Sequence, residues 1–193
     1  MDMPAFTFKS LEPLLAAGKG GMVLMDTKGP MMVRTTVGLL DVLLKGRDLS
    51  GLMVLTDRPY MFVSRLLDKQ GIPQGKLRYL DAVSGISGEE PAEACNLETL
   101  SSPFCGSLVH EVFVSSGMGS TVRELGFVLV DNLNSLSTLV SDRCIHSFLE
   151  GLRTTVERNQ GMVSIVVADR ERLLTLGNIV DDLGFMKIDA IDL

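Results

Sequence analysis

The stretch DTKGPMMVRTTVGLL (residues 26–40) decides how this chain is interpreted, because it joins a short apolar run to a helix-type run. The apolar run GMVLM (21–25) has the length and composition of a buried strand. In the run 31–46, apolar residues recur at the spacing of one helix face, at Val33, Val37, Leu40 and Leu44. A strand followed at once by a helix is where an α/β protein places a phosphate-binding loop. An ordinary strand-to-helix turn has the same local character, so the stretch alone leaves both interpretations open.

Apolar strand-type runs alternate with amphipathic helix-type runs along most of the chain. Strands are predicted over 21–26, 51–57, 76–83, 126–133, 161–169 and 185–193, and helices over 31–46, 58–71, 141–160 and 170–183. The helix at 141–160 has the clearest apolar stripe, formed by Ile145, Phe148, Leu149, Leu152 and Val156. This alternation predicts a three-layer α/β/α fold with a mostly parallel central sheet. We expect residues 1–193 to form a single domain.

The segment 84–120 departs from this alternation, since it is rich in Ser, Gly and small residues. Long loops without structure are uncommon in compact domains, so a short helix is expected within 104–115. The part before it, 84–103, is expected to be mobile or to face a partner.

Composition excludes several classes of function. The chain has 193 residues, 46% of them hydrophobic, and a formal net charge of −6. Nucleic acid is therefore not an expected partner, because its binding requires clustered Lys and Arg. The start of the chain has no signal-peptide pattern, and no apolar run reaches the ~20 residues of a membrane span, so we expect a cytoplasmic protein. The three cysteines form no CxxC pair and are expected to be reduced thiols.

A phosphate loop of the form G-x-x-x-x-G-K-[ST] can be aligned with residues 28–35. Arg34 then takes the lysine place, and Thr35 supplies the Mg²⁺ hydroxyl, followed by Thr36. Lys28 and Val33 take the two glycine places, and Val33 is β-branched where close backbone approach is needed. Pro30 removes one N–H from the cradle that would hold phosphate. Gly29 is the glycine that remains.

Two strand-end aspartates complete the candidate site. The run FVLVD (127–131) is a Walker-B pattern, in which Asp131 would hold Mg²⁺. Asp57 follows the second strand in VLTDRPY (54–60) and could polarise an attacking water, although it is one methylene shorter than glutamate. Asp26, Asp81 and Asp169 also end strands, and the alternative for each of the five is that it caps a helix or begins a turn.

Taken in order, these segments resemble the RecA superfamily, and within it the archaeal KaiC-like and RadA branch. The resemblance covers roughly residues 10–193, from GGMVLMDTKGP…RTTVGLL through FVLVDNLNSL to FLEGLRTTVERNQGMVSIVVAD. It implies a RecA-like P-loop NTPase fold that binds ATP and Mg²⁺ between subunits. The implied nucleotide-binding residues are Gly29, Arg34, Thr35, Thr36 and Asp131, with Thr35 and Asp131 on Mg²⁺ and Asp57 near the catalytic position.

The departures from the motif lead to two expectations. The first is a degenerate RecA/KaiC-like domain without ATP hydrolysis and without a retained cofactor, acting as a regulatory or protein-binding module. The alternative is a divergent Mg·ATP-binding protein or ATPase completed by a partner subunit. A third interpretation, a different α/β enzyme, has no nameable chemistry. A protein partner or self-association is expected, and Met31 and Met32 form a hypothetical patch that faces another subunit.

Overall fold

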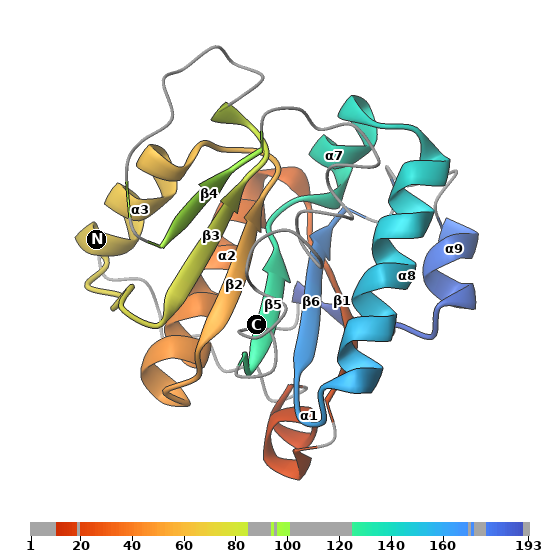
Figure 1. Ribbon diagram of the computed structural model, residues 1–193, viewed down its shortest axis with the longest axis horizontal. Coiled ribbons are helices and arrows are strands. Elements are labelled where there is room, and N and C mark those ends of the chain that lie inside the picture. The colour runs from red at the N-terminus through yellow and green to blue at the C-terminus, as the bar shows by residue number, and fades with distance from the viewer. Residues whose placement is uncertain are drawn as a thin grey trace.

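The chain forms a parallel sheet with helices on both faces (Figure 1). The computed structural model describes residues 11–18, 20–84, 94, 96–100, 125–169, 171 and 177–190. In chain order its elements are α1 (Glu12–Ala17), β1 (Gly21–Asp26), the 3₁₀-helix η1 (Gly29–Met31), α2 (Met32–Leu40), the π-helix η2 (Asp41–Gly46), β2 (Gly51–Leu55), α3 (Tyr60–Lys69), β3 (Leu77–Asp81), β4 (Leu97–Thr99), β5 (Phe127–Val130), α7 (Leu133–Leu139), α8 (Asp142–Arg158), β6 (Val163–Ala168), α9 (Gly177–Asp182) and β7 (Met186–Asp189).

The sheet has seven strands among the described residues, in the order β4-β3-β2-β5-β6-β1-β7. Each neighbouring pair is parallel. The register of β1 against β6 runs from Gly21 opposite Val163 to Asp26 opposite Ala168. The carboxyl ends of the strands therefore lie along one edge, which is where open α/β sheets bind ligands.

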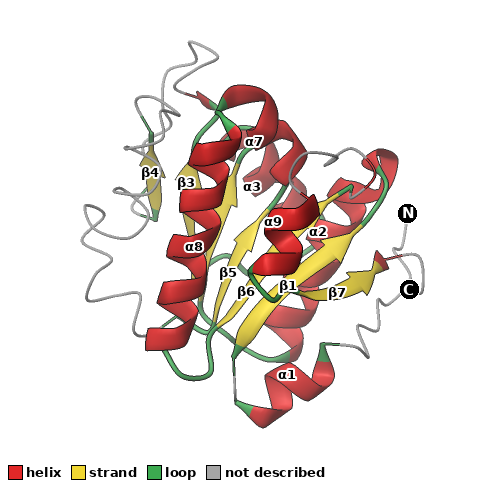
Figure 2. Ribbon diagram, turned by 90° about the vertical axis from the view of Figure 1, so that its right-hand side faces the viewer, coloured by secondary structure: helices red, strands yellow, loops and turns green. Residues whose placement is uncertain are grey.

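Burial on both faces explains the continuous apolar strands. All residues of β2, β5 and β6 are buried, as expected where helices cover both sides of a parallel sheet. On β1, Val23 and Met25 belong to the core shared with α1, α2 and α3. Met22 and Leu24 point to the opposite core, beneath α7, α8 and α9 (Figure 2). The predicted three-layer α/β/α fold is confirmed, and its sheet is parallel throughout the described strands.

Most predicted elements are present with shorter bounds. The run 31–46 is one continuous helical stretch whose last six residues are π-helical. The apolar stripe of α8 is buried as predicted. Ser141 occupies its N-cap position, but the Ser141 side chain makes no capping hydrogen bond. The final edge strand is β7, and the predicted helix at 170–183 is described only over Gly177–Asp182.

Several expectations need correction. The segment 84–103 was expected to be mobile or to face a partner, but its described residues 97–99 form the edge strand β4 and Leu100 is fully buried. The strand predicted over 126–133 ends at Val130, and α7, which was not predicted, begins at Leu133. Cys144, on α8, is disulfide-bonded rather than a reduced thiol. The helix predicted within 104–115 lies outside the described residues. Over the described part of the chain, none of the helices is both long enough and apolar enough for a membrane span.

Candidate functional site

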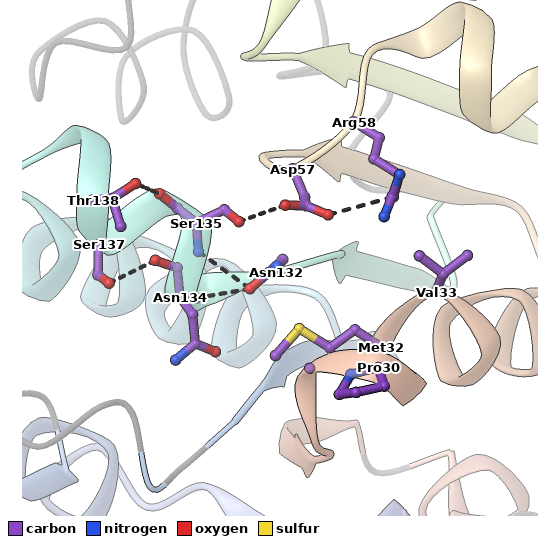
Figure 3. A pocket seen from close by; sticks show the side chains of 11 residues that line it. Pro30, Met32, Val33, Asp57, Arg58, Asn132, Asn134, Ser135, Ser137 and Thr138 are labelled. Carbon is purple, nitrogen blue, oxygen red and sulfur yellow. Dashed lines mark hydrogen bonds and ion pairs between the residues drawn. The ribbon is translucent and has the colours of Figure 1, made fainter.

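A pocket of about 500 Å³ opens at the carboxyl edge of the sheet (Figure 3). It lies between the start of α2, the turn after β2 and the start of α7. Its lining comprises Gly29, Pro30, Met32, Val33, Asp57, Arg58, Asn132, Asn134, Ser135, Ser137 and Thr138. The volume is in the range of small-ligand pockets. Of the residues predicted to bind nucleotide, Gly29 lines this pocket, and the catalytic candidate Asp57 lines it as well.

The turn between β1 and α2 is helical almost from its start. Only Thr27 and Lys28 separate β1 from η1. The Met31 N–H donates to the Lys28 carbonyl at 2.8 Å, and the Met32 N–H donates to the Gly29 carbonyl. Gly29 does not adopt a positive φ. The backbone donors of Met31 and Met32 are thus used inside the turn, where a phosphate cradle would point its N–H groups at a ligand.

The side chains that follow the turn point in different directions. Thr35 is buried, and its hydroxyl lies 3.2 Å from the Thr27 hydroxyl. Thr36 is buried as well, and it lines a second, smaller cavity rather than the 500 Å³ pocket. Arg34 is exposed and does not line either cavity. The sequence-predicted cluster of Gly29, Arg34, Thr35 and Thr36 is therefore not gathered around one pocket.

Asp131 is held inside the protein by Thr56. Its Oδ1 accepts hydrogen bonds at 2.7 Å from both the backbone N–H and the hydroxyl of Thr56. Burial raises the pKa of Asp131 to about 7, against the opposing effect of these hydrogen bonds, and the Asp57 charge adds to the rise. Asp131 as a whole residue is 7% exposed. Close to neutral pH, Asp131 is thus divided between its ionised and its neutral form.

The Thr56 hydroxyl also reaches a second acceptor. It lies 2.7 Å from Asp131 Oδ1 and 2.6 Å from the Asn132 carbonyl oxygen, and it has one proton to donate. Its proton is therefore shared between the Asp131 carboxyl group and the Asn132 carbonyl.

Asp57 is engaged across the mouth of the pocket. Its Oδ1 accepts a hydrogen bond of 2.6 Å from the Ser135 hydroxyl on α7, and its Oδ2 lies 3.5 Å from Arg58 Nε (Figure 3). The Arg58 guanidinium stacks over the Phe62 ring, 4.8 Å from its centroid. Asp57 therefore joins the β2–α3 turn to α7 and is already paired where it would have to orient a water.

The polar residues of α7 make most of their hydrogen bonds within the protein. Asn132 caps α7 by accepting from the N–H groups of Asn134 and Ser135. The Asn134 amide pairs with both backbone groups of Asp169, at 2.7 and 3.0 Å. Ser137 and Thr138 donate to carbonyls three residues earlier. The sequence did not lead us to predict α7; Asn132, the second residue after the buried strand β5, was the signal for its N-cap.

Asp81, Asp169 and Lys28 also lie at the carboxyl edge of the sheet. Asp81 accepts hydrogen bonds from Tyr60 N–H, Val83 N–H and both donors of Ser84, so it organises the turn after β3. Lys28 lies 2.6 Å from Glu171 and 3.7 Å from Asp169, and the hydrogen bond to Glu171 raises the pKa of Lys28. Within the described ranges, no three His, Cys, Asp or Glu residues form a group that could hold a metal ion.

The comparisons with known proteins agree with the fold. No protein-family profile matches the sequence, and no curated protein matches it. Among solved structures, a KaiC-like protein from the archaeon Pyrococcus horikoshii is similar with a TM-score of 0.56 at 14% identity, over 89% of this chain and 73% of that one. The flagellar accessory protein FlaH from Methanocaldococcus jannaschii is similar with a TM-score of 0.58 at 11% identity, over 97% of this chain and 78% of that one. The chain has the RecA-like fold, and at these identities the likeness concerns the fold alone.

Proposed function

We propose that this chain is a RecA-like domain that does not hydrolyse ATP and acts as a regulatory or protein-binding module. The observation that carries the proposal is the 3₁₀ turn over Gly29–Met31. At the position of a phosphate loop, this turn uses the N–H groups of Met31 and Met32 for its own hydrogen bonds. Pro30, at the centre of the turn, has no N–H to offer.

The groups expected to bind Mg²⁺ support the same proposal. A metal ligand needs a free lone pair and, for a carboxyl group, ionisation. The Thr35 hydroxyl pairs with Thr27, and Asp131 Oδ1 accepts two hydrogen bonds from Thr56. Burial raises the pKa of Asp131 to about 7, which disfavours its ionised form in the metal-free protein. Both residues are thus engaged in hydrogen bonds within the protein.

The exposed apolar side chains suggest where a partner would dock. Of the five large apolar residues exposed in the described part of the chain, Met31 and Leu139 adjoin lining residues of the pocket, and the Phe62 ring packs against the lining residue Arg58. Met31 follows the lining residue Pro30, and Leu139 follows the lining residue Thr138. Met32, by contrast, is only 7% exposed, so the predicted two-methionine patch is wrong for Met32.

We call Met31, Phe62 and Leu139 the apolar rim of the pocket. Sedimentation tests whether the chain self-associates through this rim. Met31→Asp combined with Phe62→Asp should lower the mass of any oligomer toward that of the 20.9 kDa chain. Met186→Asp is the matched control, because Met186 is an exposed methionine on the edge strand β7. If wild type, double variant and control all sediment as the same monomer, this chain does not self-associate through the rim.

A second candidate is a divergent Mg·ATP-binding protein or ATPase whose site is completed by a partner subunit. One observation favours it: the 500 Å³ pocket lies at the carboxyl edge, with Asp57 and Arg58 in its wall. This candidate predicts that Mg·ATP stabilises the protein, by about 2.7 kcal/mol at 100 times its dissociation constant.

Phosphate release tests whether this chain hydrolyses ATP, and the stabilisation by Mg·ATP tests binding without hydrolysis. We expect no release of phosphate from ATP above background, at protein concentrations high enough for assembly. Asp131→Ala is the control for contaminating ATPases, since a contaminant releases phosphate equally in both preparations. Release by the wild type that Asp131→Ala abolishes would refute the proposal and establish the second candidate.

A further inference from the structure

A second cavity, of about 20 Å³, lies between α2, α3 and the carboxyl ends of β2 and β5. Most of its wall is apolar, from residues such as Leu40, Met53 and Leu67. Four polar residues also line it: Thr36, Asp57, Arg58 and Asp131. The cavity is thus a small, largely apolar space into which α2, the β2–α3 turn and the end of β5 each bring a polar group.

Two polar atoms at this cavity are buried without a hydrogen bond. Thr36 Oγ1 has no hydrogen-bond partner among the described residues, although Thr36 is only 6% exposed. The Arg58 Nε atom is also shielded from solvent and makes no hydrogen bond, and its ion pair with Asp57 spans 3.5 Å. Buried donors and acceptors are rarely left unsatisfied in folded proteins, because each one costs free energy. Two such atoms in residues that line the same small cavity indicate a bound molecule that forms hydrogen bonds with both.

The volume indicates what that partner is. One water molecule needs at least about 10–15 Å³ of such space and two to four polar partners. A cavity of about 20 Å³ has room for one water, and it is far smaller than the few hundred Å³ typical of small-molecule sites. We infer that one ordered water molecule occupies this cavity, hydrogen-bonded to Thr36 Oγ1 and to the polar groups of Arg58 and Asp131 on the facing walls. This hydration site adjoins the 500 Å³ pocket, with which it shares Met32, Val33, Asp57 and Arg58, and it does not depend on the proposed function.

The water gives Thr36 a structural role, in place of the nucleotide-binding role that the sequence motif implied. It connects the middle of α2 to Arg58 on the β2–α3 turn and to Asp131 at the end of β5. Asp131 is then held from two sides, by Thr56 and by the water.

A crystal structure of the wild-type chain is the direct test, at a resolution that shows ordered waters. A density peak should lie at hydrogen-bond distance from Thr36 Oγ1, about 2.7–3.0 Å, and from at least one polar group of Arg58 or Asp131. A cavity without density between well-ordered walls would overturn the inference.

A matched pair of variants gives an independent readout. Thr36→Val removes a hydroxyl that the water would bind, whereas Ser164→Ala removes a buried, unpartnered hydroxyl on β6 that lines neither cavity. Thr36→Val should lower the melting temperature by about 2–4 °C, because the water loses a hydrogen bond. Ser164→Ala should leave it unchanged or raise it. A Thr36→Val protein that melts at or above the wild-type temperature contradicts the inference.

Discussion

Replacing Asp131 with asparagine should stabilise this protein at alkaline pH and remove most of one pH-dependent component of its stability. Asparagine keeps an oxygen that can accept the two hydrogen bonds from Thr56, and it carries no charge. Burial raises the pKa of Asp131 from an ordinary 3.8 to about 7 in the folded state. Ionising the buried carboxyl therefore costs the folded state up to about 4 kcal/mol, at 1.36 kcal/mol per pH unit.

The direction of the effect follows from which state binds the proton more tightly. Between pH 3.8 and about 7 the folded state keeps the Asp131 proton that the unfolded state has lost. The stabilisation is fully present below pH 3.8, and it is lost as the pH rises through 7. Between pH 5 and pH 8, this one group should lower the free energy of unfolding by about 2–3 kcal/mol.

Urea denaturation of wild type and Asp131→Asn at pH 5 and pH 8 measures this loss. Comparing the two proteins cancels the titration of the other groups, provided that the denaturant slope is the same for both. The wild type should lose about 2–3 kcal/mol more than Asp131→Asn between the two pH values. Parallel pH profiles, or an Asp131→Asn protein that is less stable at pH 8, would refute the burial of Asp131 as the cause of its raised pKa.

Three further variants test the packing around the site by chemical denaturation. Asp81→Asn should destabilise the fold by about 1–3 kcal/mol, because an amide N–H₂ group replaces one of the two carboxylate oxygens. Those oxygens accept hydrogen bonds from Tyr60, Val83 and Ser84, so an Asp81→Asn protein of wild-type stability would contradict the role of Asp81 in organising that turn. Asn134→Ala should lower the free energy of unfolding by about 1–3 kcal/mol, because it removes both hydrogen bonds to the Asp169 backbone. Unchanged stability would show that α7 is held by apolar contacts alone. Gly51→Ala should cost about 1–3 kcal/mol or more, since its Cβ would clash with the Phe127 ring. Gly46→Ala has open space around its Cβ and should be neutral or slightly stabilising, so equal effects of the two substitutions would refute the close approach of β2 to Phe127.

The fold was predictable because its signals are local and repeat along the chain. Strands such as 163–168 are apolar at nearly every residue, which only a sheet covered on both faces requires. The stripe from Ile145 to Val156 fixed both the helix and its buried face. The missed elements lacked such signals. The strand β4 is three residues long and half-buried, within a segment rich in small residues.

The candidate site was less predictable, because its properties depend on which hydrogen bonds close around it. The sequence shows that Thr35 and Asp131 occupy the expected places, but the partners that engage them, Thr27 and Thr56, lie 8 and 75 residues away. The apolar pattern also ran through Leu133, which hid the start of α7 and its cap at Asn132. Met31 and Met32 are neighbours in sequence, yet one is exposed and the other is buried.

The closed turn at residues 29–31 leaves no cradle for the phosphates of ATP, and calorimetric titration of Mg·ATP into the full chain measures whether they bind. We expect no binding heat at millimolar ATP, and the same flat trace for wild type, Thr35→Ala and Asp131→Ala. A one-site binding curve for the wild type that both variants abolish would contradict it, because the turn would then have to open into a working phosphate cradle.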